Sequence, residues 1–178
     1  MQTTSTPALL VNVPLRNTSF VGRRTLLQAV EEQLEAQDTA AVLPHALHGL
    51  GGVGKSQLVL EYIYRNQHRY KVICWIPAEG ESLILAALAG LAARLGVVQP
   101  GQEGPASSAV RAVLEALRTG VPYDDWLLVF DNAENIDVVR QYFPTNGPGK
   151  VIVTSRNRGW ERVCPTRPPG PGSSPNSP

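Results

Sequence analysis

The sequence lacks the features that mark secreted and membrane-spanning proteins. Its 178 residues include only two cysteines, Cys74 and Cys164, and neither belongs to a closely spaced pair or a metal-binding cluster. We therefore expect free thiols in a reducing compartment rather than a disulfide framework. No apolar run reaches the roughly 18 residues of a membrane span, and residues 1–6 lack the basic and apolar regions of a secretory signal. A cytoplasmic protein is the default expectation.

An excess of charge of either sign is also absent. There are 16 Lys and Arg residues against 15 Asp and Glu, which gives a formal net charge of +1. The chain therefore has no basic field to attract nucleic acid and no acidic tail. Hydrophobic residues make up 43% of the sequence, so a chain of this length can bury the core of one domain.

Glycine, by contrast, is concentrated in one stretch that carries a specific motif. Residues 49–56 read Gly-Leu-Gly-Gly-Val-Gly-Lys-Ser, which fits G-x-x-x-x-G-K-[ST], the phosphate-binding loop. Glycine lets the backbone approach a ligand closely, so the N–H groups of the loop can surround a polyphosphate. Lys55 can reach the β- and γ-phosphates, and Ser56 can place its hydroxyl on Mg²⁺. A helix expected at 54–66 directs the positive end of its dipole at the same anion.

The surroundings of this loop favour the phosphate-binding interpretation. The apolar run 46–48 enters the loop as a short strand, and apolar residues follow at helical spacing within 58–63. The alternative is a Gly-rich turn between a strand and a helix, but such a turn does not need Lys-Ser at its end. The residues expected to contact a nucleotide here are Gly49, Gly51, Gly52, Val53, Gly54, Lys55, Ser56 and Gln57.

Along the rest of the chain, apolar runs of strand length alternate with helical patterns. The expected strands are 46–48, 71–76, 126–131 and 151–154, and the expected helices are 24–37, 54–66, 81–95, 105–118 and 136–142. This alternation predicts an α/β fold with a parallel sheet. We expect residues 1–19 to form an extended arm, 20–163 the domain with 38–44 as a connector, and 164–178 a disordered tail rich in Pro, Gly and Ser.

A second functional element stands at the end of the third expected strand. Residues 127–130 are apolar and Asp131 follows them directly. Ligands of open α/β sheets bind at the carboxyl ends of the strands, so Asp131 can hold Mg²⁺ through water opposite Ser56. The alternative is an aspartate that ends a strand in a turn; the phosphate loop favours the metal site.

Three further positions bear on hydrolysis. Many hydrolytic relatives carry a second acidic residue at or near Asn132, and an amide cannot take a proton from the attacking water. Glu134 is close enough in sequence to take that proton in place of residue 132, and this alternative stays open. Arg156 follows the fourth expected strand and either reaches the γ-phosphate or is a solvated arginine at a strand end. We expect slow hydrolysis, or hydrolysis that needs help.

In combination, four segments resemble the NB-ARC domain, the nucleotide-binding module of the signal-transduction ATPases with numerous domains. The segments are Phe-Val-Gly-Arg at 20–23, the loop at 49–56, Leu-Leu-Val-Phe-Asp-Asn-Ala-Glu at 127–134 and Val-Thr-Ser-Arg at 153–156. Residues 13–17 and 75–79 look most like bacterial members that carry tetratricopeptide repeats. The resemblance covers about residues 13–163.

The resemblance implies a fold, a ligand and a set of roles. It implies a three-layer fold whose Thr154 strand lies between the strand of the phosphate loop and the Asp131 strand. Such proteins typically rest with ADP, switch on when ATP replaces it, and then self-associate. The implied adenine contacts are Phe20, Val21 and Gly22; the implied phosphate, sensor and magnesium residues are Lys55, Ser56, Asp131 and Arg156.

The later parts of that family do not follow in this sequence, which ends in the Pro-rich tail. One hypothesis is a truncated or frame-shifted product, which the downstream DNA read in the other frames would test. Two other functions stay open. One is a metabolic phosphotransferase built on the same loop, which would need a pocket for an acceptor. The other is a remnant that binds nucleotide weakly.

Overall fold

The computed structural model describes residues 8–19, 23–36, 41–42, 52–98 and 104–155. Within these ranges five strands form one sheet in the order β1-β3-β4-β5-β2. Every pairing between neighbouring strands is parallel, so all the strands end at the same edge of the sheet. The strands are β1 (Leu9–Val11), β2 (Ala41–Val42), β3 (Val72–Pro77), β4 (Trp126–Asp131) and β5 (Lys150–Val153).

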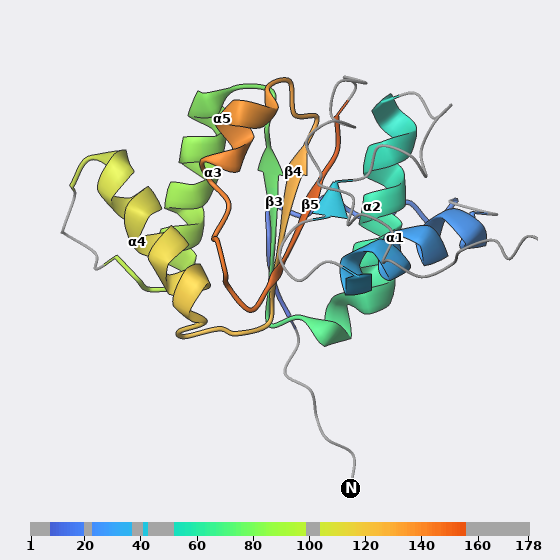
Figure 1. Cartoon of the computed structure of the whole chain (residues 1–178), viewed down its shortest axis with the longest axis horizontal. Coiled ribbons are helices and arrows are strands. Elements are labelled where there is room, and N and C mark those ends of the chain that lie inside the picture. The colour runs from blue at the N-terminus through green and yellow to red at the C-terminus, as the bar shows by residue number, and fades with distance from the viewer. Residues whose placement is uncertain (1–7, 20–22, 37–40, 43–51, 99–103, 156–178) are drawn as a thin grey trace, which may run out of the picture.

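Helices cover both faces of the sheet, which gives three layers (Figure 1). One face carries α1 (Arg24–Ala36) and α2 (Gly52–Asn66), which continues into the short 3-10 helix η1 (Gln67–Arg69). The other face carries α3 (Glu81–Arg94), α4 (Ala106–Thr119) and the short α5 (Ile136–Arg140). The α/β fold predicted from the alternation of strands and helices is therefore confirmed.

The central strands are apolar at almost every position because both of their faces are buried. In β4, Leu127 and Val129 pack into the core beneath α1 and α2. Leu128 and Phe130 point to the opposite face and pack into the core beneath α3 and α4. Cys74, expected as a free thiol, is buried in β3.

Two strands differ from the expectation. Leu9–Val11 lies in the expected arm and is extended, but it forms the edge strand β1, with Leu10 opposite Ile73. Ala41–Val42 lies in the expected connector, yet it pairs with β5. Both strands are too short to show the apolar pattern on which sequence prediction depends. The expected strand 46–48 and the tail 164–178 lie outside the described residues.

Strand β5 lies between β2, which precedes the phosphate loop in the chain, and β4, which carries Asp131. This confirms the strand order that the resemblance implied. The parallel sheet brings the ends of β3, β4 and β5 to one edge. Among the described helices, none combines the length and the apolar character needed to cross a membrane.

Candidate functional site

Two hydroxyl groups meet on one carboxylate at the carboxyl edge of the sheet. Ser56 Oγ donates a hydrogen bond of 2.6 Å to Asp131 Oδ1, and Thr154 Oγ1 donates one of 2.7 Å to the same oxygen. Ser56 lies near the start of α2, Asp131 ends β4 and Thr154 follows β5. Side chains from α2 and from the residue after β5 therefore bind the same oxygen atom of the aspartate that ends β4.

Backbone hydrogen bonds hold the ends of β4 and β5 together around this carboxylate. Thr154 N–H donates to Phe130 O at 2.9 Å, and Ala133 N–H donates to Thr154 O at 2.8 Å. Between them, Asn132 N–H donates to Thr154 Oγ1 at 2.9 Å. Asn132 has a φ of 57°, in the left-handed region that asparagine adopts more readily than most residues. The chain thus turns directly after Asp131, while the carboxylate stays against Ser56.

Lys55 brings a positive charge to the same edge. Its Nζ donates a hydrogen bond of 2.6 Å to the backbone oxygen of Ser155, two residues after the end of β5. Ser155 Oγ in turn donates to Ala133 O at 2.7 Å. The ammonium group is half-buried and bound to a neutral carbonyl, which a phosphate oxygen can replace.

The amino end of α2 lies at this edge, because Lys55 and Ser56 near its start contact the ends of β4 and β5. The helix has 15 residues, so its dipole presents a partial positive charge here. Hydroxyl and carboxylate oxygens are ligands that Mg²⁺ accepts, and a helix amino terminus with a lysine suits phosphate. The residues present therefore fit a nucleotide with magnesium.

The structure brings together Lys55, Ser56 and Asp131, three of the residues that the sequence singled out. Gly52 and Gly54 lie in the first turn of α2, followed by Gln57, whose Oε1 is buried without a hydrogen-bond partner in the described part of the chain. The binding roles of all these residues stay predictions. Phe20, Val21, Gly22, Gly49, Gly51 and Arg156 lie outside the described residues, as does the side chain of Val53.

Two site residues escaped the sequence-based prediction. One is Thr154, whose hydroxyl binds Asp131. The other is Glu79, whose Oε1 accepts a hydrogen bond of 2.8 Å from Asn132 Nδ2. Thr154 directly follows β5 and Glu79 comes two residues after β3, the two strands next to β4. The rule that sites form at the carboxyl ends of parallel strands could have marked both as candidates, although not their contacts. Glu134, the candidate from the sequence, is exposed.

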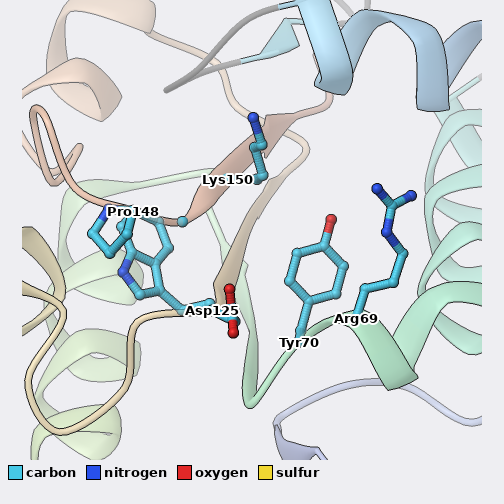
Figure 2. Close-up of a pocket in the computed structure, with 7 residues that line it drawn as sticks. Arg69, Tyr70, Asp125, Pro148 and Lys150 are labelled. Carbon is cyan, nitrogen blue, oxygen red and sulfur yellow. The ribbon is translucent and has the colours of Figure 1, made fainter.

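A cavity of about 150 Å³ lies at the opposite edge of the sheet, where the strands begin (Figure 2). Trp126 and Lys150, the first residues of β4 and β5, contribute to its wall. The cavity is therefore separated from Asp131 by the full length of β4. Its lining residues are Arg69, Tyr70, Asp125, Trp126, Pro148, Gly149 and Lys150.

The charged groups at this amino edge pair with one another. Lys71 forms ion pairs with Asp124 and, at 3.7 Å, with Asp125. The Trp126 indole is buried and donates to Leu117 O at 2.8 Å. These contacts join the start of β4 to the residue before β3 and to α4, which gives them a structural role.

Comparison with known proteins agrees with the geometry of the carboxyl edge. Residues 23–166 match the NB-ARC domain. A nucleotide-binding leucine-rich repeat (NLR)-like protein of Hyaloscypha variabilis is 27% identical over 164 residues, an alignment that covers 80% of this chain and 16% of that protein. The chain thus spans about a sixth of that relative's length. Since the match extends from the start of α1 past β5 and includes Lys55, Ser56 and Asp131, the chain belongs to the NB-ARC family of nucleotide-binding domains.

Proposed function

We propose that this domain is a nucleotide switch that binds ADP and ATP with Mg²⁺ and hydrolyses ATP slowly. The observation that carries the proposal is the convergence of Ser56 and Thr154 on Asp131 Oδ1, beside the amino end of α2. This places a hydroxyl and a carboxylate, the donor set for magnesium, next to the charges that suit a diphosphate. Membership of the NB-ARC family supports adenine as the base.

The residues at the edge divide the work of holding the nucleotide. Bound Mg²⁺ would offset the negative charge of the phosphates. Ser56 and Asp131 would hold the metal ion, directly or through water, and Thr154 keeps the Asp131 carboxylate in place. Lys55 would exchange its contact with Ser155 O for a phosphate oxygen, which replaces a neutral partner by a charged one.

The contact between Lys55 and Ser155 supports the switching part of the proposal. A ligand that draws Lys55 away changes the contacts of Ser155, and Arg156 is the next residue in the chain. We assign Arg156 as the sensor of the γ-phosphate and Phe20, Val21 and Gly22 as the adenine contacts. The structure describes none of these four, so their assignment rests on the family.

Family membership and the NLR-like relative support a signalling role for the protein that contains this domain. Self-association through the domain and a cytoplasmic location belong to the same proposal. The kinship with bacterial members that carry tetratricopeptide repeats rests on residues 13–17 and 75–79.

The experiment that tests the proposal is mass spectrometry of the nucleotide released from the purified, denatured protein. We expect ADP from the wild-type chain and none from a Lys55→Ala variant purified in parallel. A nucleotide-free wild-type protein that also shows no saturable binding of added ADP up to millimolar concentration would overturn the assignment. Steady phosphate transfer to a small acceptor would instead favour a metabolic phosphotransferase.

A further inference from the structure

Glu79 is a carboxylate at the carboxyl edge that has no role in nucleotide binding as proposed above. Its Oε1 accepts a hydrogen bond of 2.8 Å from Asn132 Nδ2. The backbone N–H of Asn132 donates to Thr154 Oγ1 at 2.9 Å, and the same hydroxyl donates to Asp131 Oδ1 at 2.7 Å. Hydrogen bonds therefore connect Glu79, through Asn132 and Thr154, to the carboxylate that Ser56 contacts.

The backbone also fixes Glu79 at this edge. Pro77, the last residue of β3, is the register partner of Asp131. The next residue, Ala78, donates its N–H to Asp131 O at 2.8 Å, so contact between the β3 and β4 segments continues to Ala78, the residue before Glu79. The Glu79 side chain is exposed, whereas Asp131 is partly buried. A water molecule at the edge can therefore reach the Glu79 carboxylate.

A group that takes a proton from the attacking water, or that positions this water, accelerates ATP hydrolysis. Asn132 directly follows Asp131, but a neutral amide has no basic site for that proton. Glu134 lies on the loop before α5 and is exposed, as Glu79 is, so exposure does not separate the two. In the described part of the chain, the carboxylate that contacts Asn132 is that of Glu79. A general base must lie within hydrogen-bond reach of the attacking water. The exposed position of Glu79 at the edge and its contact with Asn132 favour Glu79 for that place.

We propose that Glu79 is the general base for ATP hydrolysis at this edge and that Asn132 positions it; the inference rests on the proposed function. A water molecule gives a proton to a Glu79 carboxylate oxygen while its own oxygen forms a bond to the γ-phosphorus. The bond from the γ-phosphorus to the bridging oxygen breaks, and the electron pair of that bond stays on ADP. Glu79 then releases the proton to solvent, which restores the carboxylate.

The decisive variant is Glu79→Gln, which keeps the shape of the side chain and removes its basicity. We expect single-turnover ATP hydrolysis to slow by about 100-fold, the lower range for loss of a general base. Affinities for ADP and ATP stay within about twofold, because Glu79 is placed on no phosphate or metal contact. After incubation with ATP, nucleotide released from this variant is ATP, whereas the wild-type protein releases ADP.

Two matched variants separate catalysis from structure. Glu134→Gln removes the neighbouring carboxylate and leaves the hydrolysis rate within about twofold of wild type. Asn132→Gly removes the amide while glycine accepts the positive φ of this position. It lowers kcat by about tenfold and leaves KM unchanged, as expected of a residue that only positions the base. Thermal melts of all three variants show whether each one folds.

Three results would overturn the inference: wild-type hydrolysis by Glu79→Gln, loss of hydrolysis in Glu134→Gln, or a wild-type protein that binds ATP and releases no phosphate. Each of these leaves nucleotide binding intact, so each is distinct from failure of the proposed nucleotide binding. The third result would also remove slow hydrolysis from the proposed function. Absence of ADP binding in the wild-type protein is the failure of the proposed function, and the assignment of Glu79 falls with it.

Discussion

The two edges of the same sheet carry similar residue types but are built differently. At the carboxyl edge, side chains from α2, from the end of β4 and from the residue after β5 meet on one oxygen of Asp131. At the amino edge, Lys71 lies directly before β3 and forms ion pairs with Asp124 and Asp125, the two residues before β4. Charge alone therefore does not distinguish a ligand site from a structural edge.

What distinguishes the two edges in the described residues is the partner of the lysine and the packing around glycine. At the carboxyl edge a helix begins with glycine, and Lys55 donates a hydrogen bond to a neutral carbonyl. At the amino edge, Gly149 packs so closely on the Trp126 ring that an added Cβ would lie 2.0 Å from Trp126 Cδ2. The proposed phosphate site lies at the carboxyl edge, whereas the amino edge is tightly packed beside its small cavity.

The largest expected effect comes from Lys55→Ala, which removes the cation of the phosphate loop from the carboxyl edge. We expect ADP affinity to fall by on the order of 100-fold, since a hydrogen bond between charged groups contributes about 1.5–3 kcal/mol. Isothermal titration with ADP measures this loss. The matched change at the amino edge, Lys71→Ala, should leave ADP affinity unaltered. Equal affinities of Lys55→Ala and the wild-type protein would refute the role of the loop.

The amino edge should be sensitive to shape. Gly149→Ala forces a methyl group into the Trp126 ring and should lower the free energy of unfolding by about 2 to 3 kcal/mol. Urea denaturation measures the change. The control is Gly90→Ala in α3, where an added Cβ meets no atom within 4 Å; it should stabilise the helix by about 0.5–1 kcal/mol. If Gly149→Ala is as stable as the wild-type protein, the edge is not closed by packing.

A smaller and more specific effect is expected at Asp131. Mg²⁺ should raise the ATP affinity of the wild-type protein. In Asp131→Ala this increase should be about tenfold smaller, because one of the two metal-holding groups is lost. Titration of ATP with and without Mg²⁺ measures that gain. Asp125→Ala, at the amino edge, serves as the control and should behave like wild type. An undiminished magnesium response in Asp131→Ala argues against a metal site here.

The smallest effect concerns the support of α2 behind the site. Glu61 on α2 is 4% exposed and accepts hydrogen bonds from Arg16 at 2.9 Å and Arg65 at 2.7 Å. The hydrogen bond from Arg16 holds the pKa of Glu61 below its ordinary value of 4.5. Glu61→Gln should therefore lower the free energy of unfolding by about 1 kcal/mol at neutral pH.

The pH dependence of this contribution has a definite sign. Above the ordinary pKa of 4.5 the carboxylate is ionised in both the folded and the unfolded chain, and its contribution is complete. As pH falls through the lowered pKa of the folded state, this contribution to stability is lost. The difference in the free energy of unfolding between wild type and Glu61→Gln should therefore shrink. Urea denaturation at several pH values measures it. Glu115→Gln, in an exposed pair with Arg118, is the control and should show a smaller difference because solvent screens that pair. A difference in the free energy of unfolding that does not change with pH would contradict this interpretation.

The sequence predicted the parts of the molecule that depend on long patterns or dense motifs. The apolar run of β4, the glycine loop and the helix after it sufficed to predict the α/β fold and to select Lys55, Ser56 and Asp131. The edge strands β1 and β2 escaped because two or three residues show no periodicity.

The contacts of Thr154 and Glu79 could not be predicted because they depend on register rather than on a motif. Thr154 reaches Asp131 only because β5 pairs with β4, with Val153 opposite Phe130. Glu79 reaches Asn132 because Pro77 pairs with Asp131 and Asn132 turns with a positive φ. Neither the register nor the turn can be read from the residues of one strand.

The most direct test of the comparison is a crystal structure of the wild-type chain grown with ADP and Mg²⁺. We expect the diphosphate at the amino end of α2 in contact with Lys55, and the metal ion beside Ser56 and Asp131. Nucleotide bound in the cavity around Trp126 and Lys150, with the carboxyl edge empty, would contradict the account.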